Sequence, residues 1–260
     1  MKNIIGFSFF SFLLVMTSFV PVEVQDYKVD IVVIDAGHGG KDPGTHGKKA
    51  KEKDIALSIA LELGATIKTY LPDVKVIYTR DDDTFIPLDK RAEIANKNGA
   101  DLFISVHCNA SPSSWVRGTE TWVMGLHKTA DNLKVAMREN SVIDLEEGAA
   151  SKYGGFDPNS PESYILFSLY QNAYLNNSVA LAEKVEKQFK ERAGRKSLGV
   201  KSAGFLVLWK TSMPSILVET GYLSNVKEES ELRNKLVQSY IASGIFRAFR
   251  DYKSEIEATN

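Results

Sequence analysis

The fold of this chain is decided by two stretches of sequence, Ile31-Val32-Val33-Ile34-Asp35-Ala36-Gly37-His38 and Leu102-Phe103-Ile104-Ser105-Val106-His107. Each is an apolar, β-branched run that predicts a buried strand, and each is followed closely by a histidine. Side chains at the carboxyl ends of strands line the ligand crevice of an open α/β sheet. We therefore expect His38 and His107, two of only four histidines in the chain, to meet at that edge.

Strands and helices alternate along the chain. We predict strands at 30–35, 75–79, 102–107, 119–124, 205–209 and 215–219, and helices at 54–71, 88–98, 162–192 and 236–252. The helix at 54–71 has an apolar residue at every fourth position from Ile55 to Leu71, as in a helix packed on a sheet. This alternation predicts a layered α/β domain. The length of 260 residues and the 43% apolar composition favour a single domain.

Residues 126–176 interrupt this alternation. A short amphipathic helix is predicted through Leu133, Ala136 and Met137, and an acidic turn and a Gly-rich stretch follow it. We interpret 126–176 as a helical insertion into a catalytic domain that spans residues 26–260. A segment that only covers the edge of the sheet is the alternative interpretation.

Residues 1–25 are predicted to be an export signal. Lys2 precedes the apolar run from Ile4 to Val20, and Pro21 and a polar stretch follow. An uncleaved membrane anchor is the alternative, because Ser18-Phe19-Val20 is a poor cleavage site. Export to the periplasm or cell envelope is therefore expected. The only cysteine, Cys108, cannot form an intramolecular disulfide, so the exported domain depends on its core.

The charge of the chain is nearly balanced. Its net charge is -1, from 32 basic and 33 acidic residues. No electrostatic footprint for nucleic acid is visible, and no polybasic patch for a membrane surface. We expect a monomer that recognises its substrate through local chemistry.

The residues around the two histidines suggest a metal site. The loop at 35–44 contains four glycines around His38, but it lacks the Gly-Lys-Ser/Thr ending of a nucleotide-binding loop. Glu52 lies at the start of the helix predicted at 54–71, where a carboxylate serves either as a metal ligand or as a partner of the helix dipole. Two histidines and one carboxylate leave the fourth position of a catalytic zinc site open for water. His46 and His127 lie in polar contexts and are assigned surface roles.

Several motifs occur in an order that resembles a known family, the zinc-dependent N-acetylmuramoyl-L-alanine amidases of bacterial cell-wall turnover. The resemblance covers about residues 30–252. The motifs are Gly37-His38-Gly39-Gly40-Lys41-Asp42-Pro43-Gly44, Lys51-Glu52-Lys53-Asp54, Thr79-Arg80, Phe85-Ile86-Pro87-Leu88 with Arg91, Ala100-Asp101-Leu102-Phe103-Ile104-Ser105-Val106-His107 and Pro214-Ser215-Ile216-Leu217-Val218-Glu219-Thr220-Gly221.

This resemblance implies a fold, a cofactor and a reaction. The fold would be a twisted mixed β-sheet flanked by helices. His38, Glu52 and His107 match the family's ligands to one Zn²⁺, and Glu219 matches its catalytic glutamate. The substrate would be peptidoglycan, cut at the amide between N-acetylmuramic acid and L-alanine. Some members of the family carry an inserted helix in this region that obstructs the zinc.

The insertion supplies acids that could occupy the open zinc position, namely Glu139, Glu146 and Glu147. Glu139 is the favoured one because it follows the amphipathic stretch from Leu133 to Met137. Such a contact would restrain the enzyme until an activator protein drew the insertion away. The alternative is that these acids are solvated, as most surface glutamates are.

Other functions are compatible with the same residues. A zinc carboxypeptidase acting on stem peptides uses similar ligands and a similar base. A catalytically idle wall-binding or activator protein is disfavoured, because it has no need of all four site residues. Arg80 and Arg91 either hold a substrate carboxylate or buttress the fold, and we leave both out of the catalytic set.

Overall fold

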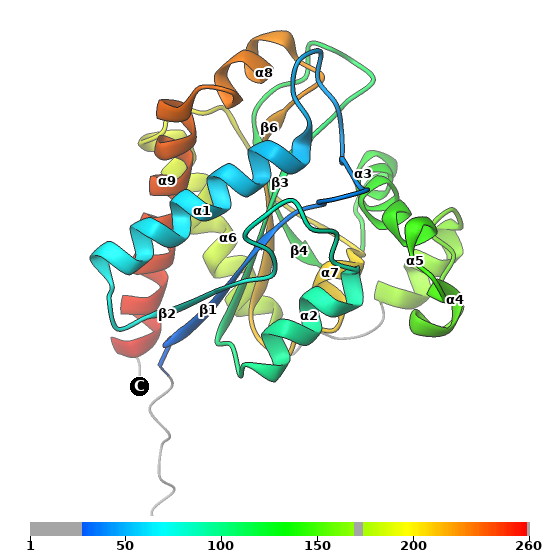
Figure 1. The fold of residues 1–260 in the computed structure, drawn as a ribbon, viewed down its shortest axis with the longest axis horizontal. Helices are drawn as coiled ribbons and strands as arrows, with labels where there is room; N and C mark the ends of the chain where they lie inside the picture. The colour runs from blue at the N-terminus through cyan, green and yellow to red at the C-terminus, as the bar shows by residue number, and fades with distance from the viewer. Residues whose placement is uncertain (1–27, 169–173, 259–260) are drawn as a thin grey trace, which may run out of the picture.

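The computed structural model describes residues 28–168 and 174–258, which are built around one six-stranded sheet (Figure 1). The strand order is β2-β1-β3-β6-β4-β5. Its strands are β1 (Ile31–Ala36), β2 (Lys75–Tyr78), β3 (Leu102–Asn109), β4 (Thr119–Met124), β5 (Ser197–Ala203) and β6 (Ser215–Tyr222). β4 runs antiparallel to β6, while the other neighbouring pairs are parallel. The mixed sheet expected from the resemblance is thus confirmed. The predicted export signal, residues 1–25, lies outside the described residues.

One face of the sheet is covered by three long helices, α1 (Glu52–Tyr70), α6 (Leu175–Glu191) and α9 (Lys235–Ala258) (Figure 1). The predicted stripe on α1 is confirmed, because Ile59, Leu63 and Ile67 are fully buried in this core. They pack against alternate side chains of the central strands, such as Ile104 and Val218. Burial of each such side chain stabilises the fold by about 1.5–3 kcal/mol.

The opposite face is covered by shorter helices. They are α2 (Leu88–Lys97), α3 (Ala130–Asn140), the 3-10 helix η1 (Ser141–Leu145), α4 (Ala149–Lys152), α5 (Pro161–Ser168) and α7 (Leu206–Trp209). Figure 1 shows α3, α4 and α5 gathered beside the sheet, and α8 (Val226–Leu232) lies near the end of β6. Ala136 of α3 and Tyr164 of α5 pack in the same core as Trp122 of β4. Within the described residues of the segment predicted as an insertion, 126–176, the helices α3, α4 and α5 share the core of this face.

Two predicted elements are wrong. A strand is predicted at 205–209, but Leu206–Trp209 is the short helix α7. Its apolar side chains pack in the same core as Trp122 of β4. Periodicity cannot separate a short buried strand from a buried helical turn. The strand that completes the sheet is instead β5 (Ser197–Ala203). It is a half-buried edge strand with little apolar patterning. The single helix predicted over 162–192 is also wrong, because Tyr174 is a turn residue between α5 and α6.

The strand ends place polar side chains at one edge of the sheet. His107 of β3 is the register partner of Glu219 on β6, and Glu219 faces Glu120 on β4. Residues paired in register project to the same face. Among the described helices, none is long and apolar enough to cross a membrane.

Candidate metal centre

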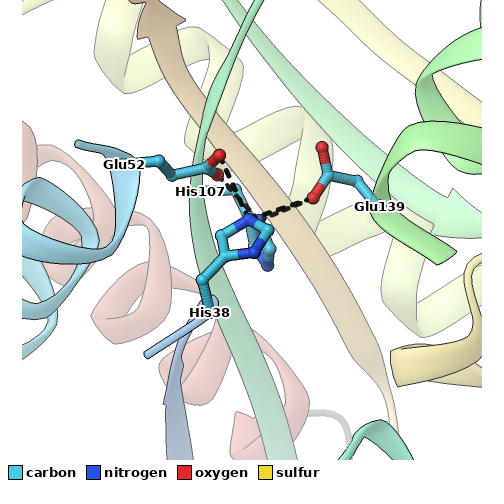
Figure 2. Close-up of side chains that lie close together, drawn as sticks. All are labelled: His38, Glu52, His107 and Glu139. Carbon is cyan, nitrogen blue, oxygen red and sulfur yellow. Dashed lines mark hydrogen bonds and ion pairs between the residues drawn. The ribbon is translucent and has the colours of Figure 1, made fainter. Parts of the chain in front are cut away.

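Four buried side chains meet at this edge of the sheet, and they are His38, Glu52, His107 and Glu139 (Figure 2). One nitrogen or oxygen atom from each lies within 4.8 Å of those from the other three. Glu52, from the start of α1, and Glu139, from α3, approach the two imidazole rings from opposite sides (Figure 2). The structure thus brings together the three predicted ligands and the one acid that the sequence favoured from the insertion.

His38 is held in an unusual backbone conformation just after β1. Its φ is +59°, and no other non-glycine residue in the described parts of the chain has a positive φ. Such a conformation costs free energy and is concentrated at functional sites. Its Nδ1 lies 2.7 Å from Oδ2 of Asp42, which directs Nε2 toward the other three side chains. A carboxylate on the second ring nitrogen is the usual way to orient a histidine that ligates a metal.

His107 presents its Nδ1 to both carboxylates. The distances are 3.0 Å to Oε1 of Glu52 and 3.2 Å to Oε2 of Glu139. Burial alone would lower the pKa of His107, but the carboxylates of Glu139 and Glu52 raise that pKa to about 9. Its ring lies against Gly37, where an added Cβ would come 2.4 Å from Cε1 and 2.7 Å from Nδ1.

The contact with Gly37 gives a testable prediction. Gly37→Ala is expected to push the His107 ring out of place and to weaken zinc affinity by at least about tenfold, the scale for disturbing a ligand's support. Competition with a chromogenic chelator measures this affinity. Gly125→Ala is the matched control, because its Cβ would lie 3.3 Å from the Cβ of Ser202, a tight contact that is still much milder than the 2.4 Å clash at Gly37. Equal zinc affinity in both variants would contradict the placement of His107 at the metal.

Glu52 is fully buried at the first residue of α1. Its carboxylate accepts hydrogen bonds from the backbone N–H groups of Thr45, at 2.7 Å, and Cys108, at 2.9 Å. Burial opposes ionisation, but the charge of His38 and the hydrogen bond from His107 hold its pKa at about 2. The sequence left open whether Glu52 is a ligand or a helix-dipole partner, and the carboxylate is turned toward the histidines.

Glu139 reaches the same point from α3. Its Oε2 lies 3.2 Å from both His38 Nε2 and His107 Nδ1, and its Oε1 accepts hydrogen bonds from Arg138. Burial opposes ionisation of Glu139 as well, but Arg138 and the two histidines hold its pKa well below the usual value. Of the other acids considered from sequence, Glu146 instead accepts hydrogen bonds from the start of α2 and from Tyr153, and Glu147 is exposed.

Glu219 lies beside this group rather than within it. It is fully buried, and neither of its carboxylate oxygens has a hydrogen-bond partner among the described residues. Arg138 Nη2 is 3.7 Å from its Oε1. Burial, and then the carboxylates of Glu139 and Glu52, raise the pKa of Glu219 well above its usual value. A buried carboxyl group with no fixed hydrogen-bond partner, placed beside a possible metal site, is suited to general acid–base catalysis.

Two functional residues were missed by the sequence reasoning. Asp42 orients His38, and its only signal was the spacing of four residues from that histidine. Arg138 joins α3 to the end of β3, because it donates to the carbonyl of Ala110 and to the side chain of Asn109. No local pattern could have revealed a contact that depends on how α3 docks.

Arg80 and Arg91 buttress the site. Arg80 donates to the carbonyl oxygens of Ala36 and Gly37. Arg91 is buried, pairs with Asp35 at 2.8 Å and donates to the carbonyl oxygen of His38 at 2.7 Å. Their guanidinium groups donate hydrogen bonds to backbone carbonyl oxygens of this loop, and these bonds stabilise the unusual backbone conformation of His38.

The geometry of the group fits zinc. A tetrahedral zinc ion with ligands at about 2.0–2.1 Å places its ligand atoms about 3.3 Å apart. Here Glu139 Oε2 lies 3.2 Å from both His38 Nε2 and His107 Nδ1, and the two oxygens of Glu52 lie 3.1 and 3.0 Å from the same two nitrogens. His38 Nε2 and Glu139 Oε2 are buried and have no hydrogen-bond partner among the described residues. Imidazole and carboxylate donors of this kind, beside a further buried glutamate, are typical of metal-dependent hydrolases.

Comparison with known proteins identifies the family. The model of the N-acetylmuramoyl-L-alanine amidase family matches residues 32–251, and the chain belongs to this family. The N-acetylmuramoyl-L-alanine amidase AmiA of Escherichia coli (strain K12) is 33% identical over 225 residues, which cover 85% of this chain and 75% of AmiA.

Solved structures show the same fold. The catalytic domain of CwlV, an N-acetylmuramoyl-L-alanine amidase from Bacillus (Paenibacillus) polymyxa var. colistinus, has a TM-score of 0.63 and 32% identity, covering 86% of this chain and 97% of that domain. The CwlD amidase from Clostridioides difficile, solved in complex with the GerS lipoprotein, has a TM-score of 0.64 and 25% identity. The match covers 87% of this chain and 99% of that one.

Proposed function

We propose that this chain is a zinc-dependent amidase that cuts peptidoglycan between N-acetylmuramic acid and L-alanine, for cell-wall turnover or daughter-cell separation. The observation that carries the proposal is the buried group of His38, Glu52, His107 and Glu139, with Glu219 beside it, in a chain of the amidase family. Family membership favours cleavage of the amide that joins the sugar to L-alanine over cleavage of the carboxy-terminal peptide bond, which a carboxypeptidase would cut.

Each site residue has a proposed role. His38, Glu52 and His107 hold one zinc ion. When bound, zinc supplies Lewis acidity, which activates water near neutral pH and polarises the scissile carbonyl. Glu219 takes the proton of the attacking water and returns it to the leaving nitrogen of L-alanine. Its burial beside the proposed zinc ligands supports this role, and so do its two carboxylate oxygens, which form no hydrogen bond with any described residue and are free to exchange a proton.

Glu139 would take the remaining ligand position when zinc is bound in the resting enzyme, and it would then exclude the attacking water from the metal. The contacts of Glu139 with both histidines support this restraint, as does the anchoring of α3 through Arg138. An activator protein would release the site by drawing α3 away. The structure of the CwlD amidase with a lipoprotein gives a precedent for a protein partner in the family.

Residues 1–25 are proposed to direct export, because the proposed substrate lies outside the cytoplasmic membrane. Domain boundaries at 26–260, with the insertion at 126–176, belong to the same proposal. The chain would then act in the periplasm or cell envelope.

Digestion of purified peptidoglycan, with and without a chelator, tests the function. We expect whole stem peptides with a free L-alanine amino group to appear in the mass spectrum, and chelation to abolish them. Release of single amino acids would instead identify a carboxypeptidase. Glu139→Ala is digested in parallel, because the wild-type enzyme could be too restrained to show activity. If neither protein releases any fragment, the proposal is contradicted.

A further inference from the structure

A separate groove adjoins the metal centre on the side of β4 and β5. It has a volume of about 550 Å³, and its lining includes Asn109, Glu120, Trp122, Arg138, Lys201 and Tyr222. Arg138 forms the boundary, because it contacts Glu139 and Asn109 at once. A substrate whose scissile bond lies at the metal centre can therefore continue into this groove.

The register of the sheet fixes the distance between the two sites. His107 pairs with Glu219, Glu219 with Glu120, and Trp122 with Lys201, so these side chains share one face. Glu120 and Glu219 face each other on neighbouring strands about 4.8 Å apart. The Lys201 ammonium lies 2.6 Å from the Glu120 carboxylate, so it is roughly 7–8 Å from the Glu219 side of the site. An extended peptide advances about 3.3–3.6 Å per residue. The Lys201 ammonium is therefore about two extended residues from a peptide bond positioned beside Glu219, which is the reach of the second or third residue of the peptide.

The chemistry of the groove floor suits an anionic group. Glu120 is buried and is already satisfied by Tyr222 Oη at 2.5 Å, by Asn109 Nδ2 at 3.2 Å and by Lys201 Nζ at 2.6 Å. The Lys201 side chain is 28% exposed, and its ammonium lies 5.4 Å from the centre of the Trp122 ring. An ammonium has three donors, and Glu120 uses one of them. The ammonium is partly exposed in the groove, so its other donors are available to a carboxylate that binds there.

We propose that this groove binds the stem peptide, and that Lys201 pairs with a carboxylate on its second or third residue. This inference rests on the proposed function. Once the lactyl carboxyl group of the sugar is joined to L-alanine, the sugar side of the bond carries no charge, so an anion in this groove comes from the peptide. Glu120 and Tyr222 act as positioning residues, because they hold the Lys201 side chain at the floor of the groove.

Two pairs of soluble substrates test the proposal with the full mature chain. Each pair is an N-acetylmuramoyl peptide with a free carboxylate at the second or the third residue, together with the same compound amidated at that carboxyl group. We expect kcat/KM to favour the acid over its amide by at least about tenfold at one of these positions. Lys201→Met should remove the preference by raising KM for the acid, and Lys201→Arg should retain most of it. The ratio within each protein is independent of how far Glu139 restrains the enzyme.

Controls separate binding from folding. Lys201→Met leaves Glu120 with one donor fewer, so Lys201→Met combined with Glu120→Gln is measured alongside it, with thermal unfolding of each variant. Lys134→Met is the matched control, because Lys134 lies at the rim of the same groove, is exposed and pairs with Asp131. An equal preference in wild type and both Lys201→Met proteins, or no preference in wild type at either position, would overturn the inference. Failure to cut any of the four compounds, by wild type and Glu139→Ala alike, would instead count against the proposed function.

Discussion

Glu219→Gln is expected to lower turnover by at least about a hundredfold, the scale for losing a general base, while zinc content and fold stay unchanged. The amide of glutamine has nearly the shape of the carboxyl group but cannot take a proton from water. No described residue forms a hydrogen bond to the Glu219 carboxylate, so the substitution breaks no hydrogen bond and weakens only the 3.7 Å contact with Arg138. Turnover is measured with a soluble muropeptide, and bound zinc by atomic absorption.

The His38→Ala variant is the counterpart of this experiment. It should lose zinc as well as activity, because it removes one of the buried nitrogens of the group. Near-normal turnover of Glu219→Gln would remove Glu219 from the mechanism. Equal zinc content in the two variants would show that His38 is not a ligand.

Glu139→Ala is expected to raise turnover by at least about twentyfold, within the usual range of coupling between a regulatory contact and a site. The substitution removes the carboxylate that lies 3.2 Å from both histidines and leaves the three proposed zinc ligands in place. Initial rates on soluble muropeptides, measured at saturating zinc, report this change. Glu147→Ala is the matched control, because Glu147 is an exposed acid on the same segment.

Loss of restraint must be distinguished from loss of structure. Thermal unfolding and zinc content of Glu139→Ala should match those of a folded, one-zinc protein. If the folded variant proves no faster than wild type, Glu139 has a structural role or contacts substrate, and the autoinhibition proposal is wrong. Removal of residues 126–155 should then also fail to activate the enzyme.

The central strands and the meeting of the histidines could be predicted because their causes are local. The apolar runs ending near His38 and His107 predict buried strands, and parallel strands bring their carboxyl ends to one edge. The order of the motifs then placed Glu52 and Glu219 with them. The structure bears out this arrangement, in which His107 and Glu219 are register partners.

Other features depend on tertiary packing and left little trace in the sequence. The strand at 197–203 lies at the sheet edge and is only half-buried, so it has no apolar alternation to reveal it. The run Leu206–Trp209 is apolar because it packs in the core, whichever secondary structure it adopts. Arg138 forms its hydrogen bonds only when α3 is packed against the end of β3. Its contacts could not be predicted from a single amphipathic stretch.

The most direct test of the account is anomalous diffraction at the zinc edge from crystals of the mature wild-type protein. The account predicts a single strong peak at about 2.0–2.1 Å from His38 Nε2, His107 Nδ1 and a Glu52 oxygen, with Glu139 as the fourth ligand. A peak elsewhere in the molecule, or a zinc ion bound without His38 and His107, would contradict it.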